Sequence, residues 1–362
     1  MHLKWWLLDE DQKRHVWALY GRFTLLSFIS CCAGATAWGA RMQELLFIVP
    51  AQISESSVNR QLPPSELMSM YMQGFRWAAV YLVAYAIDFF CSSIAKLLVL
   101  SRMRDFAVPS AVTAQRRWTV CGRIVTALVI LGNTAGLISN IAAAAYREQL
   151  ANIYSDASAA FAANNTALGI NLLVNSLDTK FSEGTNAASY QELLEAIVLL
   201  IIVAAFIAVG GMGARLLNSA LRHLKNAQDS NIMAGTAGAQ VKNLAVAASA
   251  EGRQLRRKIL ATCLVAFVTF LLRAVFSIIY ASANKLQNTN CSYIHGTACS
   301  PCWNEYAYMQ FFILFTPEFQ LTIVLLSTPL SLLVALWGMT DVRALELMSS
   351  NRQQLAILRV QQ

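Results

Sequence analysis

Ionisable side chains interrupt several long apolar runs of this 362-residue chain, and they are the residues best suited to chemistry. They are Asp88, Lys96, Arg123, Arg273 and Glu318, with Glu195 nearer the end of its run. A charged side chain is costly in hydrocarbon, so each is a candidate for a ligand, proton or ion site. Lys96 and Arg123 stand close to the ends of their runs, where a long basic side chain can extend to the lipid headgroups.

Polar residues recur at helical spacing on three of these runs, and residues three, four or seven apart share one face of a helix. The three sets are Tyr81, Tyr85, Asp88, Ser92 and Lys96; Thr126, Asn133 and Asn140; and Thr262, Thr269, Arg273, Ser277 and Tyr280. Lipid cannot satisfy such faces, so we expect them to meet inside a helix bundle. This predicts an intramembrane polar cluster of Tyr85, Asp88, Ser92, Asn133, Asn140, Arg273 and Glu318.

The polar cluster has two interpretations. It lines a cavity for a ligand, proton or ion, or it consists of hydrogen bonds between helices and an Asp88–Arg273 ion pair that fix the packing. We favour the second, because paired charges in membranes are structural as well as functional.

Cys291, His295, Cys299 and Cys302 are spaced closely enough to hold zinc. If their segment lies outside the cytoplasm, an oxidising environment favours one disulfide and one spare thiol among the three cysteines instead. We therefore predict a disulfide, no metal site and no cofactor.

No catalytic motif stands out. Gly210-Gly211-Met212-Gly213 is not followed by the Lys-Ser/Thr of a phosphate-binding loop, and close helix packing explains it better. Metalloprotease, hydrolase and kinase motifs are absent from the sequence. We expect no enzyme activity and assign no catalytic residue.

The elements that must position these residues are membrane spans. The chain is 56% hydrophobic and 13% charged, about half the charged fraction of a soluble domain. Roughly 20 apolar residues cross the hydrocarbon as a helix. Six stretches qualify: Phe23–Ala40, Trp77–Leu100, Thr119–Tyr146, Leu193–Leu217, Ile259–Asn284 and Met309–Met339. The fold class is an all-α polytopic bundle of six spans, or seven if Pro317 and Pro329 divide the last run in two.

Charge sets the orientation. With the N-terminus inside, inner segments hold 19 of the 28 Lys and Arg residues and outer segments hold six. This bias predicts that both termini are cytoplasmic. The inner parts are an amphipathic lead-in 1–22, loops 101–118 and 215–258, and a tail 341–362; the bundle 23–340 has outer loops 41–76, 147–192 and 285–308. The N-x-S/T glycosylation motifs at Asn164 and Asn290 both fall in outer loops. Pro63-Pro64 should interrupt any helix in the first outer loop.

The loop 215–258 is the main cytoplasmic feature and ends in a basic cluster. Its members are Arg253, Arg256, Arg257 and Lys258. Anionic membrane lipid or a protein partner is a natural ligand for them, although topology signalling alone accounts for such a cluster. The net charge of +8 has the same explanation, so nucleic acid is not expected as a partner.

Several motifs in residues 205–340 are familiar as an ordered set. They are Gly210-Gly211 with Ala214-Arg215-Leu216, then Arg256-Arg257-Lys258, then Phe270-Leu271-Leu272-Arg273, and last Pro317-Glu318 before an apolar stretch that ends near Met339. This part resembles the tobamovirus multiplication protein family of plants, GPCR-like helical membrane proteins with relatives across eukaryotes. The resemblance implies a scaffold in the plasma membrane or an endomembrane such as the vacuole or lysosome. Plant members support assembly of viral replication complexes, and no enzyme activity comes with the family.

The sequence thus predicts a GPCR-like scaffold or receptor that presents its basic cytoplasmic loop to partners. Two alternatives stay open. One is a solute or ion transporter or channel that uses the polar cluster. The other is a structural subunit of a larger membrane complex.

Overall fold

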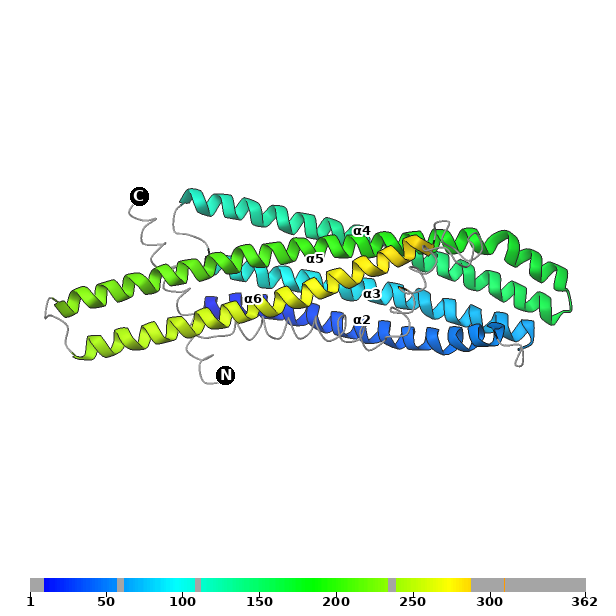
Figure 1. Ribbon diagram of the computed structural model, residues 1–362, viewed down its shortest axis with the longest axis horizontal. Helices are drawn as coiled ribbons and strands as arrows, with labels where there is room; N and C mark the ends of the chain where they lie inside the picture. The colour runs from blue at the N-terminus through cyan, green and yellow to red at the C-terminus, as the bar shows by residue number, and fades with distance from the viewer. Residues whose placement is uncertain (1–9, 57–61, 108–111, 234–238, 288–308, 310–362) are drawn as a thin grey trace. The chain divides into compact units, whose positions relative to one another are not determined.

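The computed structural model describes residues 10–56, 62–107, 112–233 and 239–287, together with residue 309. Five helices make up almost all of this part: α2 (Glu10–Ser56), α3 (Pro64–Ala107), α4 (Val112–Ala162), α5 (Thr166–Met233) and α6 (Ala239–Gln287) (Figure 1). The described residues form no strand, which confirms the all-α prediction. All five helices are long and apolar enough to cross a membrane. The last predicted span, Met309–Met339, lies outside the described residues except for its first residue.

Every described helix is longer than a membrane span. The shortest, α3, has 44 residues, whereas about 20 suffice to cross the hydrocarbon. The first five predicted spans fall one each within α2 to α6. The segments 41–76 and 147–192, expected to be loops, are mostly helical extensions of these spans, and so are 101–118 and 215–258. We predicted loops in these segments because their composition is polar. The extensions nevertheless carry enough apolar residues to pack as helices.

Pro63-Pro64 marks a helix boundary, as expected. Pro64 is the first residue of α3, and the carbonyl of Pro63 accepts hydrogen bonds from the amides of Glu66 and Leu67 at 3.0 Å each. Proline suits the first helical position because its missing N–H would have no partner there and its φ angle is already helical. Glu66 in the first turn adds a favourable interaction with the helix dipole.

The turn between α4 and α5 is three residues long, and its two asparagines end one helix and cap the next. Asn164 adopts a left-handed conformation with φ 58°. Its amide donates to the Phe161 carbonyl at 3.0 Å and the Asn165 amide donates to Ala160 at 2.9 Å, which together form a Schellman motif. The side-chain oxygen of Asn165 then accepts from the Leu168 amide at 3.2 Å and caps α5.

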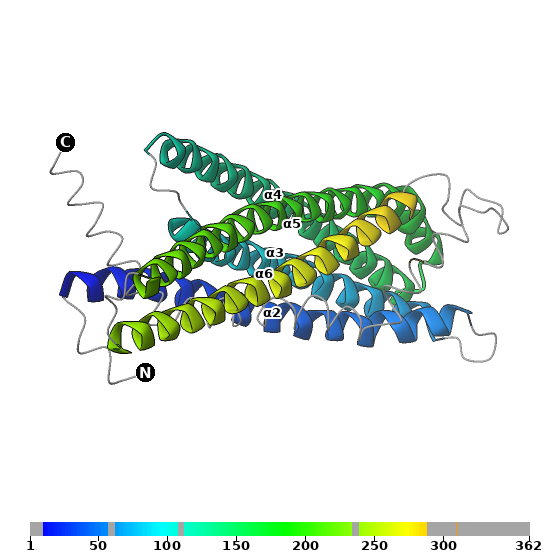
Figure 2. The same cartoon turned by 60° about the vertical axis from the view of Figure 1, so that its left-hand side comes forward.

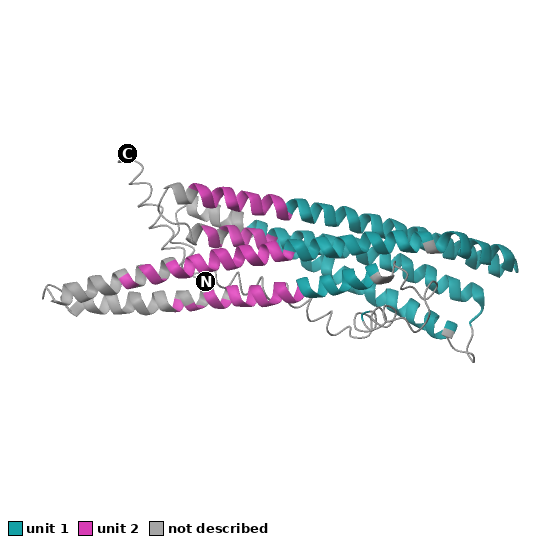
Figure 3. Cartoon of the chain, turned by 45° about the horizontal axis from the view of Figure 1, so that its top comes forward, with its two compact units in different colours: residues 1–94, 130–198, 274–325 teal, residues 95–129, 199–273, 326–362 magenta. Residues whose placement is uncertain are grey.

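The chain divides into two compact units (Figure 3). Unit 1 comprises residues 1–94, 130–198 and 274–325, and unit 2 comprises residues 95–129, 199–273 and 326–362. By the predicted topology, the helix segments of α3 to α6 in unit 1 include the outer ends of these helices, and those in unit 2 include the inner ends.

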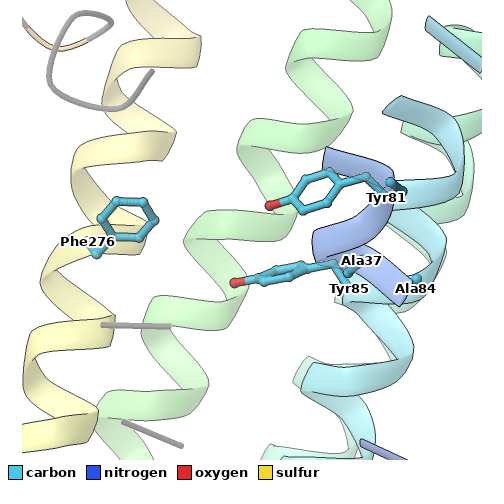
Figure 4. Close-up of a cluster of buried hydrophobic side chains, with 6 residues drawn as sticks. Ala37, Tyr81, Ala84, Tyr85 and Phe276 are labelled. Atoms are coloured by element: carbon cyan, nitrogen blue, oxygen red, sulfur yellow. The ribbon is translucent and has the colours of Figure 1, made fainter. Parts of the chain in front are cut away.

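Unit 1 contains two apolar clusters. In the first, Tyr81, Ala84 and Tyr85 of α3 pack with two alanines of α2 and with Phe276 of α6 (Figure 4). The second lies in the segments expected to be outer loops. It joins α3, α4 and α5 through Phe75, Leu150, Ala151 and Tyr154, with Met68, Tyr71, Met72, Leu173, Leu177 and Phe181 packed against them. Tyr154 stacks on both Phe75 and Tyr71, with ring centroids 5.4 and 5.3 Å apart. This second core explains why the predicted outer extensions of α3, α4 and α5 are helical.

Unit 2 holds its own apolar core. Phe206 of α5 and Phe270 of α6 meet edge to face, with ring centroids 5.9 Å apart. Gly210 lies so close to the Cys263 sulfur that a Cβ atom there would overlap it. Gly210 thus serves close packing of α5 on α6, as the sequence predicted, whereas a Cβ added at Gly211 would meet nothing within 4 Å. The two helices run side by side in both views (Figures 1 and 2).

Candidate functional site

The best-defined polar site of unit 1 is built around Glu195, which lies on α5 and is 1% exposed. The hydroxyl of Tyr85, from α3, lies 3.0 Å from each of its carboxylate oxygens and donates to them. The side-chain amide of Gln191, one turn earlier on α5, donates to Oε2 at 3.1 Å. Figure 4 shows the two tyrosines of α3 extending their hydroxyls toward α5. These donors stabilise a buried carboxylate that lipid could not solvate.

Three further hydrogen bonds link helices of unit 1 through backbone carbonyls. Asn140 donates to the Leu82 carbonyl at 3.2 Å, Ser139 to Ala187 at 2.7 Å and Ser189 to Ala281 at 3.0 Å. Helical carbonyls keep a second lone pair, so these bonds join α4 to α3 and α5, and α5 to α6, at no cost to the helices. They are the packing contacts expected between membrane helices. Asn140 is fully buried, and its Oδ1 has no donor among the described residues.

Asp88, which is on α3 like Tyr85, contacts α2. The hydroxyl of Ser30 on α2 donates to its Oδ1, and its carboxylate lies against Gly34. Asp88 belongs to unit 1 and Arg273 to unit 2. Their pairing stays a prediction.

A cluster of charges and aromatic rings lies at the predicted outer ends of the spans. Arg41 forms a buried ion pair with Glu44, 2.6 Å between Nη1 and Oε2, and its guanidinium lies over the Tyr81 ring at 5.6 Å. The Arg147 guanidinium makes cation–π contacts with the rings of Phe75 and Phe181, 5.5 and 5.0 Å from their centroids. We call Arg41, Glu44, Tyr81, Arg147 and Tyr280 the outer boundary cluster; Glu44, Arg41 and Tyr280 are near enough to act electrostatically on Arg147.

The chain matches no family model, no curated protein and no solved structure. The argument for function therefore rests on the residues themselves.

Unit 2 buries two basic side chains completely. Lys96 of α3 is 0% exposed, and its ammonium group lies 4.7 Å from the centre of the Phe270 ring on α6, a cation–π geometry. The expectation that Lys96 extends to the headgroups is therefore wrong, because α3 continues past it to Ala107 and packs it inside the unit. Arg273 is also fully buried, whereas Arg123 is exposed as expected.

The remaining members of the predicted polar cluster divide between buried, exposed and undescribed positions. Ser92 is fully buried and donates to the Phe89 carbonyl of its own helix, and Asn133 is also buried. Thr126, from the stripe that contains Asn133, is exposed and donates to Gly122 within α4. Glu318 lies outside the described residues.

Other predicted sites fall largely beyond the described residues or side chains. Asn290, Cys291, Cys299 and Cys302 belong to this group, as do the side chains of Arg253, Arg256 and Lys258, while Arg257 is exposed. Asn164 is exposed at the turn between α4 and α5. Cys31 and Cys32 of α2 are exposed, whereas Cys91 of α3 is buried. The described residues contain no group of three His, Cys, Asp or Glu side chains able to hold a metal ion.

Sequence reasoning missed the central role of Glu195 and the whole outer boundary cluster. Glu195 was visible as a charge inside an apolar run, but nothing in its own helix pointed to Tyr85. The cluster had a clearer signal, since Arg41 and Arg147 are each the first residue after a predicted span. Arginines at that position mark the depth at which a span leaves the hydrocarbon.

Proposed function

We propose that this chain is an integral membrane scaffold or receptor, GPCR-like in its helical organisation, that presents a rigid cytoplasmic arm to protein partners. One observation carries the proposal. Helix α5 continues to Met233 and α6 begins at Ala239, so the described residues of the predicted cytoplasmic loop 215–258 are all helical. The helices of this segment are therefore longer than membrane crossing requires.

A preformed helical arm suits a docking role. It loses less conformational freedom on binding than a loop of the same length, and this raises the affinity that its contacts can give. Arg222 and Arg257 are exposed on its two helices. Such an arm fits a partner with an acidic surface, because complementary charge speeds association. Its membrane would be the plasma membrane or an endomembrane of the vacuole or lysosome type.

Co-purification of the full chain from detergent tests this role. We expect a cytoplasmic partner to be retained by the native protein and lost in the Arg222→Glu/Arg257→Glu variant. The charge-matched control Arg76→Glu/Lys285→Glu changes exposed residues at the predicted outer ends and should keep the partner. Equal retention in both variants would refute the arm as the docking surface. Fixed stoichiometry in every variant would instead support a structural subunit.

A transporter is the second candidate, and the buried ionisable residues favour it. Glu195 in unit 1, and Lys96 and Arg273 in unit 2, are each at most 1% exposed. Intramembrane ionisable side chains commonly line ion and proton pathways. Proton or solute flux into vesicles reconstituted with the native chain, absent with Glu195→Gln, would support this function. Absence of flux for a panel of solutes with the native chain would count against it.

A further inference from the structure

The part of α4 in unit 2 carries an exposed apolar stripe. Val120, Ile124 and Leu128 follow one another at intervals of four residues and are 48%, 53% and 48% exposed. On a helix that crosses a membrane, apolar side chains that no other helix covers face the lipid tails. The stripe therefore marks the lipid-facing side of α4 near its predicted cytoplasmic end.

Three exposed arginines extend this stripe toward the cytoplasm. Arg116 precedes Val120 by one turn, Arg117 precedes Ile124 by two turns, and Arg123 is next to Ile124. The predicted span begins at Thr119, so Arg116 and Arg117 lie at headgroup depth. Arg123 lies about one turn deeper and is long enough to reach the same depth.

A fourth arginine, on α3, lies against the opposite side of α4. The side chain of Arg104 lies directly on Gly122, where an added Cβ would overlap its Nη1 and stand 3.3 Å from its Cδ and Cζ. Gly122 is two residues from both Val120 and Ile124, so it faces away from the stripe. Arg104 therefore belongs to the packing of α3 on α4 and is not part of the lipid-facing side.

The charge around these residues is strongly basic. Segments 95–129 and 199–273, which form most of unit 2, contain 15 Lys and Arg residues against three Asp and Glu residues. Topology signalling accounts for basic residues in cytoplasmic segments. It does not require them to continue a lipid-facing stripe.

We propose that Arg116, Arg117 and Arg123 bind the phosphate of an anionic phospholipid headgroup in the cytoplasmic leaflet. A guanidinium matches phosphate with two parallel N–H donors, which a lysine cannot do. The exposed apolar stripe of Val120, Ile124 and Leu128 receives the acyl chains of the same lipid. This site is independent of the docking arm and does not involve the basic cluster Arg253–Lys258.

The test uses the full chain in mixed micelles titrated with phosphatidic acid, with bound lipid counted by native mass spectrometry. Near a membrane surface each basic residue contributes about 1 kcal/mol, so the Arg116→Gln/Arg117→Gln/Arg123→Gln variant should bind on the order of 100-fold more weakly. The control Arg215→Gln removes one exposed arginine of the same unit and should bind nearly as well as the native chain. If each substituted arginine weakened lipid binding by the same factor in the two variants, the proposed site would be wrong.

A variant of unchanged charge separates a built site from diffuse attraction. The Arg116→Lys/Arg117→Lys/Arg123→Lys variant keeps every charge but removes the paired N–H donors of the guanidinium groups, so we expect it to weaken binding roughly tenfold. Binding at native strength in this variant would show that charge alone attracts the lipid and would overturn the site. Excess inorganic phosphate should leave the lipid bound. If phosphate displaced the lipid, the ligand of the site would be a soluble anion instead. Equal thermal unfolding midpoints in phosphatidylcholine alone establish that each variant is folded.

Discussion

The hydroxyl of Tyr85 lies 3.0 Å from both carboxylate oxygens of Glu195, and this contact joins α3 to α5 inside unit 1. Both side chains are buried, Tyr85 at 5% and Glu195 at 1% exposure. A hydrogen bond to a buried charged group is worth more than one to a neutral group, because the charge has no water to turn to when the donor is removed.

Tyr85→Phe should therefore lower the stability of the folded chain by about 1.5–3 kcal/mol, with little change in packing volume. The same substitution in a Glu195→Gln background should cost less, because the acceptor is then neutral. Thermal unfolding in detergent measures both effects. Tyr190→Phe, at an exposed tyrosine of α5, is the matched control and should change little. An equal cost of Tyr85→Phe in the two backgrounds would show that the hydroxyl does not stabilise the carboxylate.

The spans themselves could be predicted from sequence because hydrocarbon imposes a long apolar run on every helix that crosses it. The extensions could not, because segments 41–76 and 147–192 lack such runs. Their signal was weaker, namely apolar residues at helical spacing such as Leu150 with Tyr154 and Leu173 with Leu177. Such spacing predicts a helix only if a partner surface exists, and the partners here come from different helices.

The choice of partner was also beyond the sequence. A helical stripe tells which residues share a face, but not which residue of another helix each one meets. Tyr85 was assigned to the right face, yet its acceptor is Glu195, which the predicted cluster omitted. Lys96 was assigned by its distance from the end of an apolar run, whereas the position of Phe270 on α6 decides its burial. The contacts of a span depend on packing that composition does not encode.

Arg147 should matter more to stability than its neighbour in the fold, Arg76. The guanidinium of Arg147 makes cation–π contacts with two rings, whereas Arg76 forms a 3.7 Å ion pair with Glu148 in which both side chains are about half exposed. Replacing Arg147 with Met should cost about 1–2 kcal/mol from the lost cation–π contacts. Arg76→Met should cost less than about 1 kcal/mol, as for other exposed ion pairs. Thermal unfolding midpoints of the two variants, measured in the same detergent, test this prediction. A larger loss of stability for Arg76→Met than for Arg147→Met would contradict it.

The turn between α4 and α5 predicts two separable effects of its asparagines. If segment 147–192 lies outside the cytoplasm, Asn164 should carry a glycan, since it is exposed and begins an N-x-T motif. Glycosidase treatment should lower the mass of the native chain by one glycan at this position, and Asn164→Gln should abolish this mass shift. Asn165→Ala keeps the motif, so the shift should persist while the lost cap of α5 costs about 1 kcal/mol. Absence of a glycan on the native chain expressed in a glycosylating cell would count against the proposed orientation.

The expected pairing of Asp88 with Arg273 calls for a double-mutant cycle. Asp88 accepts a hydrogen bond from Ser30, which a neutral amide at position 88 could partly keep, and Arg273 is fully buried. A lone charge at the centre of a span costs about 2.5–3.5 kcal/mol on the insertion scale, so Asp88→Asn alone and Arg273→Gln alone should each reduce thermal stability in detergent.

If the two side chains pair, the combined variant should recover part of the loss, because it leaves two neutral groups that can still hydrogen-bond. Ser30→Ala serves as the control for Asp88, since it removes the observed donor without altering any charge. Strictly additive losses would show that the two charges do not interact. Recovery of stability together with loss of partner binding or of flux would assign the pair to a functional site rather than to helix packing.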